Sequence, residues 1–291
     1  MSLILVQILN GLQYGLLLFL AASGLTLVFG ILGVINLAHG SFYMIGAYMA
    51  LTLTSYTGDV FLALAAGIPL AFLIGMAIEW LFVRHLYKRD HLQQVLLTFA
   101  LILVFNEAQQ SIWGNYPKSI PTPSYLSSSI SLTPDLGYSV YRLALMAICV
   151  GLALLMMFVI QKTRVGRLIR AAESNPEMVE ALGFDSRVLF RVVFAAGAAL
   201  AAAAGMLAAP VESAYPGIGE RVLIISFVVV VIGGIGSIRG AFLGSLLIGL
   251  ADAFGKVFVP KFSSVLIYAL MALVLVLRPN GLFGRNIVER V

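Results

Sequence analysis

Charged residues are scarce in this chain of 291 residues: they make up 11% of it, whereas 61% of the residues are hydrophobic. A typical soluble domain is about 25% charged and about 45–50% apolar. The mean hydropathy is +1.02, and no single core of this size could bury all the apolar stretches. The composition therefore excludes a water-soluble enzyme and predicts a membrane protein.

Cysteine and histidine are nearly absent as well. The single cysteine, Cys149, excludes a disulfide within one chain, and three scattered histidines without partner cysteines exclude a zinc site of ordinary spacing. The Gly255-Lys256 pair lacks the leading glycine and the following hydroxyl residue of a phosphate-binding loop. We therefore expect no catalytic residue, metal or cofactor in this chain, and any ATP and magnesium to be bound by other subunits.

Long apolar runs fill the rest of the chain, and one membrane crossing takes about twenty residues. Residues 3–35, interrupted by glycines, form either one crossing with a broken end or two with one cut short, and residues 40–56 follow. The sequence predicts an all-α polytopic membrane protein with eight or nine transmembrane segments, some short or broken, in a single domain over residues 1–291. The seven clear segments are residues 60–83, 92–112, 139–160, 189–209, 222–238, 241–257 and 264–277.

Basic residues set the orientation. No lysine or arginine precedes Arg84, so the first apolar run lacks the basic region of a cleavable signal peptide and we expect it to be retained. Thirteen of the 18 basic residues then fall on one side, chiefly in residues 84–89, 162–191 and 278–290. By the positive-inside rule that side is cytoplasmic, and so is the C-terminus, whereas the side of the N-terminus stays open. The bases form no stripe with interleaved aromatics, so we expect no nucleic-acid partner.

Two loops are long enough to carry function. Residues 114–137 contain four prolines and predict an irregular outer loop, which is either a plain connector or a rim for an extracytoplasmic partner, aided by Glu212, Glu220 and Arg221. Residues 162–191 predict a helix, a turn and a second short helix that Asn175 caps. This cytoplasmic insert is either a helix held by lipid headgroups or, as we favour, a docking helix for a cytoplasmic protein.

One internal repeat links the two halves of the chain: residues 30–36 match residues 233–239, and residues 40–42 match residues 240–242 after a short shift. Each copy ends one apolar run with glycines and begins another, which is typical of discontinuous helices in a transporter. Polar groups at such a break are candidates for a substrate path. The candidate pathway residues are Asn36, His39, Ser41, Tyr43, Glu107 and Ser237.

Each candidate has a structural alternative. His39 can cap a helix by binding backbone carbonyls, and Arg239 can simply mark the cytoplasmic turn. Glu107 either faces the interior or lies near the outer headgroups. Two other acids look structural: Asp252 has Lys256 one turn away, and Glu79 lies within reach of Arg84.

Four motifs carry a resemblance to a known family: GVINLAHG (residues 33–40), TRVGRLIRAAE (163–173), VIGGIGS (231–237) and RPNGLFG (278–284). Together they resemble the inner-membrane permease of high-affinity branched-chain amino acid ABC importers, nearly from end to end. Residues 170–183 are similar to the loop through which such permeases contact their ATPases. The resemblance thus implies an ATPase-coupling role for Arg164, Gly166, Arg167, Arg170, Ala171, Ala172, Glu173, Pro176, Glu177, Ala181, Leu182 and Gly183.

The resemblance also implies an assembly in the bacterial inner membrane. Its members would be a second related permease, two ABC ATPase subunits, a periplasmic substrate-binding protein and the surrounding membrane lipid. Relatives of this group carry urea, amides and aromatic acids as well, so the motifs do not fix the solute. An ion-driven secondary transporter or channel, or a membrane scaffold without transport, are the alternatives.

Overall fold

The computed structural model describes residues 2–87, 89–133 and 136–284 of the chain. The described part is built around helices that match the apolar segments of the sequence to within a few residues, so the all-α prediction is confirmed. The long helices are α1 (Ser2–Leu32), α2 (His39–Thr57), α3 (Val60–Leu81), α4 (His91–Trp113), α5 (Val140–Lys162), α8 (Ser186–Ala208), α9 (Ile218–Gly233), α10 (Ile238–Phe258) and α11 (Ser263–Leu277).

Seven helices of the described residues are long and apolar enough to cross a membrane, and α2 and α9 are not among them. Helix α9 has only 16 residues, whereas α2 has 19, and both are largely buried inside the bundle. The chain is therefore a multi-pass membrane protein in which two further helices lie inside the bundle. The count of eight or nine crossings stays a prediction.

The first helix is central and unbroken. Residues 3–35 were expected to be interrupted at Gly24, Gly30 and Gly33, yet α1 continues to Leu32 and only Gly33 leaves the helix, with φ of 63°. Gly24 instead provides close packing, because a Cβ there would lie 2.4 Å from the carbonyl oxygen of Gly197. The glycines within α1 thus serve helix contact and do not break the helix.

Helix α1 packs along α10 in the opposite direction. Gly11 faces Leu250, Gly15 faces Ser245, and near the other end Gly30 faces Gly236. Because these α1 glycines have no side chain, the two helix backbones lie close together, and such close contact is the usual source of packing energy between helices in a bilayer. Alanine-rich α8 packs in the same manner against α1, α2 and α3.

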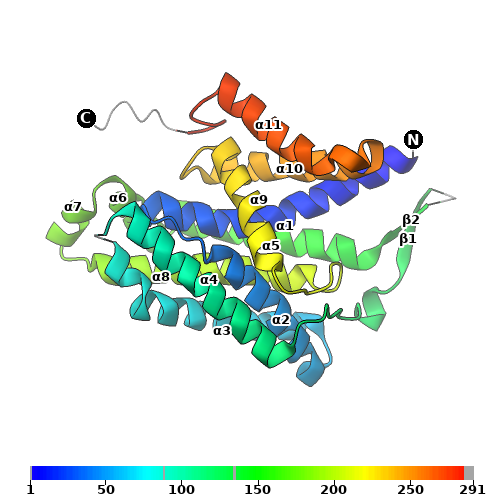
Figure 1. Cartoon of the computed structure of the whole chain (residues 1–291), viewed down its shortest axis with the longest axis horizontal. Helices are drawn as coiled ribbons and strands as arrows, with labels where there is room; N and C mark the ends of the chain where they lie inside the picture. The colour runs from blue at the N-terminus through cyan, green and yellow to red at the C-terminus, as the bar shows by residue number, and fades with distance from the viewer. Residues whose placement is uncertain (1, 88, 134–135, 285–291) are drawn as a thin grey trace.

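The cytoplasmic insert and the outer loop lie at opposite ends of the molecule (Figure 1). The insert forms α6 (Arg164–Ser174) and α7 (Pro176–Ala181). The N-terminus of α1 lies at the other end, beside the hairpin of β1 (Ser129–Thr133) and β2 (Leu136–Ser139). The expected helix, turn and short helix of the insert is confirmed.

The outer loop is more regular than its prolines suggested. The 3-10 turn η2 (Ser124–Leu126) lies in this loop before the hairpin. Two other 3-10 turns lie elsewhere: η1 (Val83–Leu86) follows α3, and η3 (Pro260–Phe262) precedes α11. Lys118 and Ala214 exchange two backbone hydrogen bonds of 2.8 Å, so both outer connections form one surface. The Tyr125 hydroxyl donates to the carboxylate of Asp59, and this bond, with the N–H groups of Phe61 and Leu62, lowers the pKa of Asp59.

Candidate functional site

Helix α2 begins inside the bundle, beside the middle of α1. The Nε2 atom of His39 lies 2.9 Å from the carbonyl oxygen of Ala21, about eleven residues before the end of α1. Eleven residues of helix are about 16 Å long at 1.5 Å per residue. Residues 33–38 therefore turn back along α1 by about that distance. Such irregular backbone is tolerated at membrane depth only inside protein or along a wet cavity.

The carboxamide of Asn36 is buried within this segment. Asn36 is 1% exposed, and neither its nitrogen nor its oxygen has a hydrogen-bond partner among the described residues. Leaving a buried polar group unpaired costs about 1–3 kcal/mol. The predicted pathway residues Asn36, His39, Ser41 and Tyr43 are all buried at this break, and their role in a path stays a prediction.

Tyr43 faces a polar recess near the outer end of the bundle. Apolar side chains of α1 and α9 form part of its wall, and Glu212, Arg221 and Lys256 bring charges of both signs to it. Arg221 donates to the Tyr215 hydroxyl at 3.3 Å. The carboxylate of Glu212 forms no hydrogen bond or close ion pair with the described residues, although the charges of Lys256 and Arg221 act on it.

The two copies of the internal repeat lie against each other. A Cβ on Gly30 would lie 2.9 Å from the Cα atom of Gly236, and both Gly234 and Gly236 adopt positive φ, at 95° and 77°. Ser237 caps α10, because its hydroxyl accepts the N–H of Gly240 at 3.1 Å. The repeat thus marks one physical junction, where α1 ends and α10 begins.

A polar cavity opens beside this junction, at the end of the bundle that carries the insert. Ser237, Arg239, Gln161 and Arg170 line it, so residues of the predicted pathway and of the insert share one cavity. The guanidinium of Arg170 also donates to the carbonyl of Ile160. The insert is therefore in direct contact with the ends of the spanning helices.

The C-terminal motif RPNGLFG packs on the end of α9. The N–H of Leu282 donates to the carbonyl of Ile232 at 2.8 Å, and that of Phe283 donates to Gly233 at 3.0 Å. The last carbonyls of a helix lack partners within it, so these bonds complete the end of α9. Two of the four family motifs thus form one structural unit, which the sequence did not predict.

Glu107 lies apart from the other candidates. Its side chain is exposed on α4, among apolar residues that are exposed as well, including Leu103 at 56% and Val104 at 62%. The neighbouring Asn106 amide donates to the Glu220 carboxylate at 2.7 Å. Glu107 therefore does not join the buried break, and of the two positions weighed for it the structure shows the outward one.

The cytoplasmic insert is held by caps at both of its helices. The Thr163 hydroxyl accepts the N–H of Gly166 at 3.1 Å, and the Asn175 side chain accepts that of Met178 at 3.0 Å. Gly166 must be small, since a Cβ there would lie 2.1 Å from the carbonyl oxygen of Ile160. The side chains of Glu173 and Pro176 lie outside the described ones.

Large apolar side chains are exposed at the tip of the insert. Met178 is 57% exposed, Leu182 is 69% and Phe184 is 49%. Gly183 between them has φ of 85° and turns the chain toward α8. A turn that presents three large exposed apolar groups is suited to contact with another protein.

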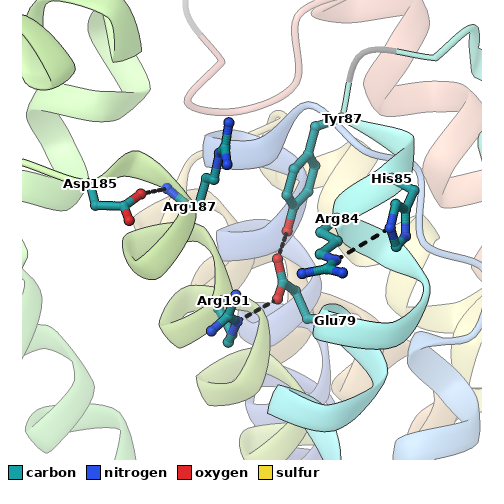
Figure 2. A network of polar contacts seen from close by, with 7 residues as sticks. All are labelled: Glu79, Arg84, His85, Tyr87, Asp185, Arg187 and Arg191. Carbon is teal, nitrogen blue, oxygen red and sulfur yellow. Dashed lines mark hydrogen bonds and ion pairs between the residues drawn. The ribbon is translucent and has the colours of Figure 1, made fainter.

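An ion pair joins α3 to α8, the helix that follows the insert, as Figure 2 shows. The Glu79 side chain is 0% exposed; its carboxylate accepts from Arg191 at 2.9 Å and from the Tyr87 hydroxyl at 2.7 Å. The predicted partner, Arg84, instead lies over the Trp80 ring and donates to His85. That prediction is wrong because helix packing places Arg191, 112 residues away in the sequence, against the carboxylate. The predicted Asp252–Lys256 pair is present at 2.5 Å.

The described features define a class: a helical, multi-pass membrane protein with an irregular break between α1 and α2 and an ordered helical insert between α5 and α8. The family described as branched-chain amino acid transport system / permease component matches residues 7–275. The chain belongs to this family, which confirms the resemblance seen in its four motifs.

Named relatives agree over almost the full length. The chain is 35% identical to the high-affinity branched-chain amino acid transport system permease protein BraD of Pseudomonas aeruginosa, over 98% of this chain and 97% of that protein. It is 32% identical to LivH of Escherichia coli K12 with the same coverage. LivM of the same strain is 27% identical over 89% of this chain and 66% of LivM. No solved structure matches the chain.

Proposed function

We propose that this chain forms one half of the membrane pore of an ATP-driven importer for branched-chain amino acids or other small amino-acid-like solutes. The observation that carries the proposal is the family match over residues 7–275, and the ordered helix α6 of the insert supports it. Because LivH and LivM are both permeases and both match this chain, a second related permease completes the pore. ATP and magnesium belong to two separate ABC ATPase subunits.

The insert of α6 and α7 is the part that those ATPases grip. Its exposed apolar tip supplies the contact, Arg170 bonds α6 to the end of α5, and the Glu79–Arg191 pair joins α8, which follows the insert, to α3. A lever fixed in this way passes a rigid-body motion to the spanning helices. The cavity that Arg170 shares with Ser237 and Arg239 is then the inward exit.

The opposite face receives the solute from a periplasmic binding protein. The two outer connections, joined through Lys118 and Ala214, form the surface on which that protein rests. The recess with Glu212, Arg221 and Tyr43 lies beneath this surface and carries both signs of charge, as a zwitterion requires. The chain then lies in the bacterial inner membrane with its C-terminus in the cytoplasm and, since α1 begins at the hairpin end, its N-terminus outside.

The test is to replace an apolar tip residue with a charge. Leu182→Asp should reduce co-purification of the ATPase about 30-fold, the effect of losing an interface hot spot worth about 2 kcal/mol. The matched control is Tyr116→Asp, at a side chain that is 82% exposed on the outer loop. Normal ATPase association in the Leu182 variant, with normal uptake, would contradict the docking role.

The alternative from another class is an ion-driven secondary transporter, which discontinuous helices equally permit. Uptake of labelled leucine into cells depleted of ATP, with the ion gradient kept intact, separates the two. We expect uptake to stop. Uptake of urea, amides and aromatic acids, compared with that of leucine in cells that retain their ATP, identifies the solute class.

A further inference from the structure

A deep apolar groove opens between α3, α5 and α8, away from the path described above. It has a volume of about 280 Å³, and every side chain that lines it is apolar. Leu27 of α1 and Val193 of α8 are buried at its base, and Leu155 of α5, 58% exposed, stands at its rim. Helix α6 closes the cytoplasmic end with Val165 and Ile169.

Such a groove is filled when the protein is in a bilayer. Its walls are helices long and apolar enough to span the membrane, so hydrocarbon surrounds the opening. A dry apolar cavity of about 150 Å³ already takes up small apolar molecules, and this groove is larger. Water finds no polar partner in it.

The length of the groove favours an acyl chain over a protein helix as its occupant. Its lining along α8 runs from Val192 to Ala203, which is about 16 Å at 1.5 Å per residue. That length matches one leaflet, half of the roughly 30 Å hydrocarbon core. A transmembrane helix of a partner would need twice this length and would meet α6 at the cytoplasmic end.

Unpaired cations stand at the same end. Lys162 follows the groove residue Ile160 by two positions, and Arg164 directly precedes Val165. Both are exposed, and neither forms an ion pair with the described residues. The cytoplasmic leaflet is the anionic one, and each basic residue near its surface contributes about 1 kcal/mol to binding.

We infer that the groove binds one anionic phospholipid of the inner leaflet, with an acyl chain between α5 and α8 and its headgroup at Lys162 and Arg164. The acyl chain touches Val165 and Ile169, on the helix that we propose the ATPase moves. The lipid therefore joins the insert to the spanning helices, and its loss loosens that connection. Lipid binding itself does not depend on the proposed function.

The first experiment measures lipid binding to the full chain by native mass spectrometry, with phosphatidylglycerol added to delipidated protein. Ala196→Phe, which places a ring in the groove, should abolish the bound lipid, and Ala196→Leu should reduce it partly. The matched control is Val276→Phe, at an apolar position 81% exposed elsewhere. Equal lipid binding in the Ala196→Phe and Val276→Phe proteins, both folded by their thermal unfolding, would overturn the proposal.

The second experiment tests the headgroup. Arg164→Gln should weaken phosphatidylglycerol binding about fivefold, the equivalent of about 1 kcal/mol, and should leave phosphatidylcholine binding unchanged. Arg89→Gln, at another exposed cytoplasmic base, should change neither. If Ala196→Phe instead prevents pairing with the second permease while lipid binding persists, the groove is a protein interface and the inference is wrong.

Discussion

The ion pair between Glu79 and Arg191 gives the sharpest test of how α3 and α8 are held together. Replacing Arg191 with methionine leaves a carboxylate that is 0% exposed with only the Tyr87 hydroxyl as partner. Removing one partner of a fully buried pair costs about 3–5 kcal/mol. Because Arg191 itself is 26% exposed, we expect the lower end of that range, about 3 kcal/mol.

The assay is reversible unfolding of the purified chain in mixed micelles with rising SDS. The double variant Glu79→Gln with Arg191→Met should regain most of the lost free energy of unfolding, because no unpaired charge stays buried. Arg187→Met is the control, since Arg187 is an exposed base one turn away without an ion pair among the described residues, and should change stability by less than about 0.5 kcal/mol. A loss below about 1 kcal/mol in Arg191→Met, with no recovery in the double variant, would refute the reasoning.

Three further predictions follow from the buried break and the outer loop. Gly40→Ala should destabilise the chain by about 1–3 kcal/mol, because the new Cβ would lie 2.0 Å from a backbone oxygen of α9. Gly151→Ala is the control: its new Cβ would have no neighbour within 4 Å, so the substitution should be neutral in the same unfolding assay. Asn36→Leu should raise stability by about 1–3 kcal/mol by removing an unpaired amide, and should lower solute uptake if Asn36 serves the path; unchanged uptake would remove it from the path. The Tyr125 hydrogen bond lowers the pKa of Asp59, so the ionised carboxylate should stabilise the outer loop above its ordinary pKa of 3.8, and this stabilisation should be lost as the pH falls below that value. Hydrogen exchange of the loop measures this loss, and Tyr125→Phe should remove most of the pH dependence.

Much of the fold follows from hydrophobic segments and helix signals. The periodicity of residues 165–172, with Asn175 and Gly183, predicts α6 and α7 as they occur, because caps and glycine turns are local in sequence. The Asp252–Lys256 pair is predictable for the same reason: its members are one helical turn apart.

Contacts between distant segments were not predictable. Glu79 has a nearby base in sequence, Arg84, but helix packing brings Arg191 to it. The low helix propensity of glycine predicts an interruption at Gly24. In the packed bundle Gly24 instead allows α1 to lie close to Gly197, and the sequence gives no sign of that contact. The recess of Tyr43 with Glu212 and Arg221 also joins four segments that no local pattern connects.

The short tail bonded to the end of α9 has a mechanical consequence. Its two links to Ile232 and Gly233 use only main-chain atoms, so they depend on chain geometry and not on which side chains are present. The turn between α9 and α10 is therefore linked to the segment that follows α11. A movement of this turn that keeps both bonds carries α9, α10 and α11 together as a single block.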